Sequence, residues 1–186
     1  GNGSIEVTLP ALGEGSKTIT ASITDVAGNA GAAGSGHTVV IDTTAPSVAA
    51  DAIAITSTGS GVEGTYAIGD TVTVEFDPTD NTGLATVTVD FSAFGGGSAV
   101  AAAFTEGVYT ASYTIAAGDL DGNAKASVTA TDTAGNTTTT QDDTAVAVDN
   151  RAPTVTVASS ATLVKEGETS TITFTFSEDP GASFSW

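Results

Sequence analysis

Carboxylate and amide side chains are the groups in this sequence that are best suited to chemistry, and many lie in turn-like segments such as DPTDNTG, DLDGN and DTAGN. The chain has 22 Asp and Glu residues, one His and no Cys. The absence of cysteine excludes thiol chemistry and thiolate metal sites. The single histidine, His37, disfavours both a zinc site and a Ser–His–Asp triad. Oxygen-rich turns instead favour calcium, which takes about six to eight oxygen ligands.

The charge balance narrows the range of partners. Four Lys and Arg residues against 22 acidic ones give a formal net charge of -18. Nucleic acid and anionic lipid are both bound through clustered Lys and Arg, so we expect neither as a partner. The apolar runs are too short to cross a bilayer, so we expect no membrane insertion of this segment. The sequence contains no Met, and we expect it to be part of a longer chain.

An internal repeat organises the sequence. ASITDVAGNAG, followed by VVIDTTAPSV, matches ASVTATDTAGNTT, followed by VAVDNRAPTV. The shared residues pair at one offset of 107 positions (132 − 25 for the first pair): Asp25 with Asp132, Asn29 with Asn136, Asp42 with Asp149, and Pro46 with Pro153. This period is about the size of one β-sandwich domain. We therefore expect the C-terminal part of a repeat at 1–44, a complete repeat at 45–150 and the N-terminal part of a third at 151–186.

Alternation of apolar and polar residues predicts strands with one buried and one solvent-exposed face, as in two antiparallel sheets packed together. Val72, Val74 and Phe76 form one such buried face. No stretch shows helical periodicity. The expected strands of the complete repeat lie at 47–56, 71–76, 84–91, 99–104, 107–115, 124–132 and 140–149.

The combination of DxAGN, a Thr-rich strand, VDxxAPxV and GDTVTVEF resembles the bacterial Ig-like repeats that form the stalks of large surface adhesins and biofilm proteins. The resemblance covers nearly the whole chain. It implies an all-β fold of tandem immunoglobulin-like β-sandwiches, with one complete seven-stranded unit flanked by two partial units. It also implies an extracellular location, on the bacterial cell surface or secreted, neighbouring repeats in the same chain, and calcium near the joints between domains.

The topology of an immunoglobulin-type sandwich predicts where the acidic turns meet. The loops after the second and sixth strands lie at the end where the first strand enters. At this first joint we expect five oxygen-bearing side chains to converge as metal ligands: Asp42 from the linker, Asp77 and Asp80 from one loop, and Asp132 and Asn136 from the other. Their types match those that calcium prefers.

The opposite end of the complete repeat shows the same pattern, and Glu14 lies in the equivalent region of the earlier repeat. We expect the metal ligands of this second joint to be Asp149 from the linker, Asp119 and Asp121 from the loop after the fifth strand, and Glu178 and Asp179 from the next repeat. Calcium at the joints would link the loops to the linkers. A row of domains connected by flexible linkers would then become a stiff rod.

A second interpretation of the same residues stays open. Asp and Asn are common in turns because they bond to nearby backbone groups and tolerate positive φ. DxAGN is then a hairpin turn, with Gly135 at positive φ and Asp132 as its cap. For Asp25 and Asn29 this interpretation is the favoured one.

Three functions are compatible with these patterns, and none is enzymatic. The first is a structural or adhesive stalk module of a bacterial surface protein, stiffened by calcium. The second is a subunit of a surface layer, sheath or filament, in which other copies of the chain contribute lateral or strand-donating contacts. The third, a carbohydrate-binding accessory module, is disfavoured because only 6% of the residues are aromatic. Asp119 and Asp121 are equally poor candidates for a glycosidase pair, since they share one short turn without an aromatic platform.

Overall fold

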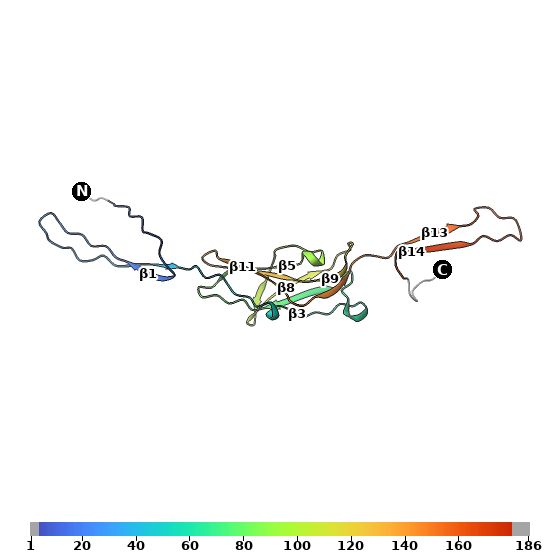
Figure 1. The fold of residues 1–186 in the computed structure, drawn as a ribbon, viewed down its shortest axis with the longest axis horizontal. Coiled ribbons are helices and arrows are strands. Elements are labelled where there is room, and N and C mark those ends of the chain that lie inside the picture. The colour runs from blue at the N-terminus through green and yellow to red at the C-terminus, as the bar shows by residue number, and fades with distance from the viewer. Residues whose placement is uncertain (1–3, 180–186) are drawn as a thin grey trace.

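The structure is a computed structural model in which residues 4–179 are described. Figure 1 shows an elongated molecule with a two-layered β-sandwich at its centre and a two-stranded arm at each end. The N-terminal arm pairs β1 (Gly15–Ile19) with β2 (His37–Ile41), and the C-terminal arm pairs β13 (Val155–Ser159) with β14 (Ile172–Phe176). The acidic turns predicted to hold a metal lie where the arms meet the sandwich.

The sandwich consists of two four-stranded antiparallel sheets, as expected for an all-β fold. One sheet has the order β3 (Ala54–Ile55), β4 (Thr71–Phe76), β8 (Val108–Thr114) and β7 (Ala103–Thr105). The other has the order β11 (Thr137–Gln141), β10 (Ser127–Asp132), β5 (Leu84–Asp90) and β6 (Val100–Ala101). The helical elements of residues 4–179 are three short 3-10 turns, at Ala50–Ala52, Val62–Gly64 and Ser92–Phe94.

A third strand pair closes the end of the sandwich that leads to the C-terminal arm. It joins β9 (Asp121–Ala124) to β12 (Val146–Asp149). Tyr66, which lies between β3 and β4, bridges β12 in parallel: its amide donates to Ala147 O (2.9 Å), and its carbonyl accepts from the amide of Asp149 (2.9 Å). The linker residue Asp149 is therefore anchored in the fold.

The seven expected strands are present as ten shorter ones, so several predicted boundaries were wrong. The strand at 99–104 divides because β6 pairs with β5 in one sheet while β7 pairs with β8 in the other. The strand at 140–149 is interrupted at Asp142, whose Oδ1 accepts both the amide and the hydroxyl of Thr144 (2.8 Å each). The first strand is interrupted by the 3-10 turn at Ala50–Ala52, and the sixth has a gap between β9 and β10. Alternation marks which face is buried, but it does not mark where a strand changes sheet.

The buried faces agree with the sequence pattern. The alternating residues of β4, β5 and β10 are at most 7% exposed, as are the neighbouring Phe91 and Ala126: Val72, Val74, Phe76, Val87, Val89, Phe91, Ala126, Val128 and Ala130. Two aromatic core residues fall outside the predicted strands. Tyr66 is 1% exposed and its hydroxyl lies 2.8 Å from Ser57 Oγ, while Phe94 is fully buried in a 3-10 turn beside Phe91.

The 107-residue offset reappears in the backbone. In the N-terminal arm Gly15 pairs with Ile41, and in the sandwich Gly122 pairs with Val148, so β1–β2 and β9–β12 share one register. The C-terminal arm likewise resembles β4 in sequence, yet Ile172 and Phe174 are 49% and 36% exposed, whereas Val72 and Val74 are fully buried. The C-terminal arm therefore presents a face that the complete repeat keeps covered.

The first prediction concerns the core of the sandwich. We expect Phe91→Ala to lower the free energy of unfolding by about 3–5 kcal/mol, because it removes a fully buried ring that contacts Phe94 and Tyr113. Phe104→Ala is the matched control, since Phe104 is 61% exposed, and should cost less than about 1 kcal/mol. Urea denaturation of the full 186-residue chain measures both. Equal losses would contradict the assigned core.

The second prediction concerns Asp70, which fastens the connection between β3 and β4. Its Oδ2 accepts the amides of Ser60 and Ala67 (2.8 Å each). These hydrogen bonds hold the pKa of Asp70 below its ordinary 3.8, and the bond from Ser60 has the largest effect. A lowered pKa stabilises the fold above pH 3.8, and this contribution is lost as the pH falls through the folded pKa. We expect Asp70→Asn to have a lower Tm than the wild type at pH 7, with the difference narrowing below pH 3.8 in thermal unfolding followed by circular dichroism. A difference that does not depend on pH would contradict this role.

Candidate metal centre

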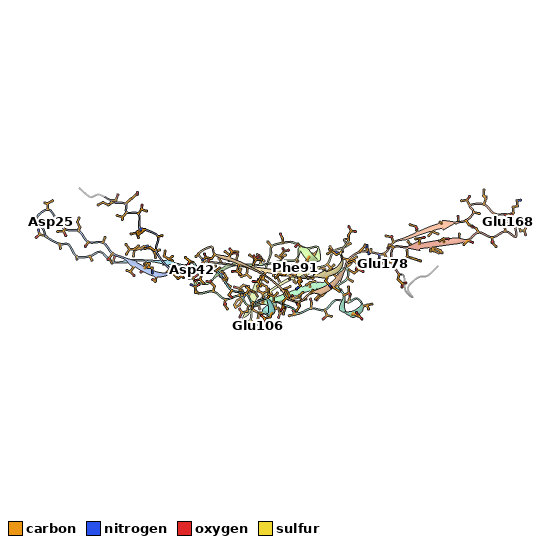
Figure 2. All side chains as sticks on the ribbon, in the orientation of Figure 1. Asp25, Asp42, Phe91, Glu106, Glu168 and Glu178 are labelled. Carbon is orange, nitrogen blue, oxygen red and sulfur yellow. The ribbon has the colours of Figure 1, made fainter. Side chains whose placement is uncertain are left out.

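Three carboxylates from separate segments meet where the N-terminal arm joins the sandwich. Asp42 follows β2, Asp80 lies in the loop between β4 and β5, and Asp132 ends β10. Each offers one carboxylate oxygen, and these oxygens all lie within 4.8 Å of one another. Figure 2 shows Asp42 at this junction. Oxygens bound to one calcium ion at about 2.3–2.6 Å are necessarily less than about 5.2 Å apart, so this spacing fits a shared cation.

Asp132 is the most deeply buried member of the cluster, at 1% exposure. Its Oδ1 accepts the amides of Ala134 (2.8 Å), Gly135 (2.6 Å) and Asn136 (2.9 Å), and its Oδ2 accepts Asn136 Nδ2 (2.7 Å). Burial raises the pKa of Asp132, but the hydrogen bonds from the side chain and backbone of Asn136 and from the other amides outweigh it and lower the pKa below 3.8. The buried carboxylate therefore remains ionised.

The loop at 25–29 has the same construction as the loop at 132–136. Asp25 Oδ1 accepts the amides of Ala27 (2.9 Å) and Asn29 (2.8 Å), and Asn29 Nδ2 donates to Asp25 Oδ2 (2.8 Å). Gly28 and Gly135 have φ of 94° and 98°, the conformation that favours glycine at this place in the turn. DxAGN is thus a turn capped by its aspartate in both repeats. The two loops differ in burial, because Asp25 is exposed whereas Asp132 is covered.

The loop at 132–136 also contacts the linker that joins the preceding repeat to the sandwich. Asn136 Nδ2 donates to the carbonyl oxygens of Asp42 (3.2 Å) and Thr44 (3.5 Å) in addition to Asp132. The side-chain amide of Asn136 therefore ties the linker to the sandwich through Nδ2.

Asp42 is held by the turn between β4 and β5. Its Oδ2 accepts the hydroxyl of Thr82, and its Oδ1 accepts the amide of Thr44 (3.0 Å) and Asn81 Nδ2 (3.3 Å). The hydrogen bond from Thr82, followed by that from the Thr44 amide, lowers the pKa of Asp42 below 3.8. A surface hollow of about 390 Å³, lined by Val40, Asp42, Thr82, Thr133 and Ala134, opens beside it.

Asp80 has one satisfied and one unsatisfied oxygen. Its Oδ2 accepts the amides of Thr82 (2.8 Å) and Gly83 (2.9 Å). Its Oδ1 is buried and has no hydrogen-bond partner among the described residues. A buried carboxylate oxygen without a partner is costly, and a cation or an ordered water relieves that cost.

Glu14 adds a further carboxylate at the edge of the cluster. Its Oε2 accepts the amide (2.8 Å) and the hydroxyl of Thr43, and its Oε1 accepts Asn81 Nδ2 (3.3 Å). Within residues 4–179 the one ion pair links Arg151 to Asp121 at the other joint. The carboxylates of the first joint therefore have no basic side chain paired with them.

Asp77, another predicted ligand of the first joint, is not one of the three carboxylates whose oxygens lie within 4.8 Å of one another. Asp77 is exposed and lines a shallow surface hollow together with Asp80, Phe104 and Tyr109. Sequence reasoning did not single out Asn81 and Thr82, although they belong to the same DPTDNTG turn as Asp80.

The second joint is arranged differently. Asp121 pairs with Arg151, whose Nη2 lies 3.2 Å from Asp121 Oδ2, and Asp149 Oδ1 accepts the amide of Arg151 (3.1 Å). Asp119 is exposed in the loop before β9, and Glu178 Oε1 is buried without a partner. Asp179 is exposed at the end of the described range. Over residues 4–179 these side chains form no second group of three carboxylates like that of the first joint.

Comparison with known proteins identifies the family. No curated protein matches the chain. The described residues contain no helix with the length and apolar character needed to span a membrane. The family model for the bacterial Ig-like domain (group 3) matches residues 1–99 and 107–179. Domains of this kind are typically non-catalytic structural modules and are commonly found outside the cell or on its surface. The chain therefore belongs to the bacterial Ig-like domain family, group 3.

Proposed function

We propose that this chain is a stalk segment of a bacterial surface protein and that calcium stiffens its first joint. The observation that carries the proposal is the convergence of Asp42, Asp80 and Asp132 to within 4.8 Å without a basic side chain paired with them. Asp42 belongs to the linker, whereas Asp80 and Asp132 belong to the following repeat. A cation shared by all three would attach the linker to the sandwich.

Electrostatics indicates why such a joint would depend on a cation. Ionised carboxylates a few ångströms apart repel one another, and the repulsion grows as water is excluded. Hydrogen bonds hold the pKa of Asp42 and of Asp132 low, which keeps both groups charged. The unpartnered Asp80 Oδ1 adds an oxygen that is available for coordination. Hard cations such as calcium prefer this donor set of carboxylate oxygens.

The shape of the molecule supports a role in a linear stalk. The two arms leave the sandwich at opposite ends (Figure 1), so repeats joined in this way would follow one another along a line. In such arrays each repeat contacts only its neighbours, and length is gained by repetition. The stiffness of the whole then depends on the joints.

Assembly with other copies of the chain, in a surface layer, sheath or filament, is the second candidate. It is favoured by the exposed apolar residues of the C-terminal arm, where Val155, Val157 and Phe174 are 50%, 60% and 36% exposed. Light scattering after size exclusion separates the two functions. An elongated monomer at all concentrations supports the stalk, and ordered association supports the assembly.

The third prediction is that the chelated chain binds calcium and becomes more stable. Isothermal titration should detect binding with a Kd of about 10⁻⁴–10⁻³ M, the range of many extracellular modules, and a hundredfold excess over Kd should add about 2.7 kcal/mol of stability. We expect Asp132→Asn to weaken binding at least about tenfold. Asp25→Asn, which changes the same turn outside the cluster, is the matched control and should leave binding unchanged. The absence of both heat and a rise in Tm at millimolar calcium would reject the proposal.

The fourth prediction concerns the stiffness of the joint. The chain has no Cys, so cysteines introduced at Ser22 in the arm and Ser112 on β8, both exposed, can be spin-labelled specifically. We expect calcium to narrow the distribution of distances between the two labels in pulsed electron paramagnetic resonance, because the ion fastens the linker to the loops. The same labels in Asp132→Asn should show no narrowing. A distribution that calcium leaves unchanged in the wild-type background would argue against a stiffening role.

A further inference from the structure

The linkers of the two joints, DTTAP and DNRAP, share Asp, Ala and Pro and differ at the two positions between them. At the 107-residue offset Asp42 corresponds to Asp149, and Thr44 corresponds to Arg151. The amide of Thr44 donates to Asp42 Oδ1 (3.0 Å), and the amide of Arg151 donates to Asp149 Oδ1 (3.1 Å). The linkers therefore begin with the same turn, and they differ in Thr43 against Asn150 and in the hydroxyl of Thr44 against the guanidinium of Arg151.

The guanidinium of Arg151 contacts the carboxylate of Asp121, which corresponds to Glu14 in the earlier repeat. Asp121 occupies the position of Glu14 at the same offset, and its Oδ2 lies 3.2 Å from Arg151 Nη2. Glu14 instead accepts hydrogen bonds from neutral donors on Thr43 and Asn81. Lys17 does not change this, because its Nζ donates to the backbone oxygen of Glu14 (3.0 Å) and not to the carboxylate.

A further carboxylate reaches the second joint from the C-terminal arm. The amide of Ser177 donates to the carbonyl of Thr154 in the linker (3.0 Å), which places Glu178 beside it (Figure 2), and Glu178 Oε1 has no partner among the described residues. The guanidinium of Arg151 stays charged at all physiological pH values, and its side-chain partner among the described residues is Asp121 and not Glu178.

We propose that Arg151 is the built-in cation of the second joint, so that the first joint takes calcium and the second does not. This inference rests on the proposed calcium role of the first joint. A dication would be repelled by the adjacent guanidinium and would compete with it for Asp121. The ion pair is exposed, with side chains 48% and 61% accessible, and exposed pairs contribute little to folding stability. Its consequence is therefore a difference in metal binding between the joints, which makes one calcium-dependent and the other independent of calcium.

Exchange of the two linker residues tests the assignment. The full chain, stripped with a chelator, is titrated with CaCl₂ by calorimetry, and bound ions are counted by native mass spectrometry. We expect one ion for the wild type, two for Arg151→Thr, and binding at least about tenfold weaker for Thr44→Arg, which places a guanidinium near Glu14. Arg151→Gln, which removes the charge and keeps the length of the side chain, should also bind two. Two equivalent ions in the wild type, or one ion in both Arg151 variants, would overturn the proposal.

A second measurement separates this inference from the proposed function. If the wild type binds no calcium, the proposed function fails, and the role of Arg151 is then tested by labels at Ser112 and Thr162, both exposed, without any metal. Broader distances between the sandwich and the C-terminal arm in Arg151→Gln than in the wild type would support a bracing arginine. Unchanged distances would overturn it.

Discussion

The confinement of like charges at one joint is the constraint on which this account depends. Oxygens of Asp42, Asp80 and Asp132 lie within 4.8 Å of one another, and hydrogen bonds lower the pKa of Asp42 and of Asp132, so these two carboxylates stay ionised near neutral pH. The linker can either swing away or share a cation with the loops. Under the proposed function, the stiffness of the joint would therefore depend on the ions around it, because a strongly acidic chain with few basic residues has little means of compensating the charge internally.

The sandwich makes this confinement possible because its topology brings distant segments to one end. The turn at 132–136 is rigid by its own construction, with Asp132 accepting three backbone amides and Gly135 at positive φ. The same turn at 25–29 is exposed. A local motif thus becomes a candidate metal site only where Asn136 meets the linker of the preceding repeat. The proposed function of the joint therefore requires two adjacent repeats.

The sequence predicted the fold class, the buried faces and the three central carboxylates, because alternation and repeated turns are local signals that the topology then combines. The strand at 99–104 was wrong in detail, since its division between two sheets depends on which neighbours are available and not on its own residues. Asn81, Thr82 and the buried Tyr66 and Phe94 lay in segments without periodicity. The ion pair of Arg151 with Asp121 requires the pairing of β9 with β12, which no local pattern reveals.

Direct observation of the ion is the most decisive measurement for this account. A crystal structure of the full chain grown with calcium, with the ion identified by its anomalous scattering, should show one ion between Asp42, Asp80 and Asp132 and none at Asp121 and Asp149. The same three carboxylates turned apart into solvent, with only water between them at millimolar calcium, would contradict the central claim.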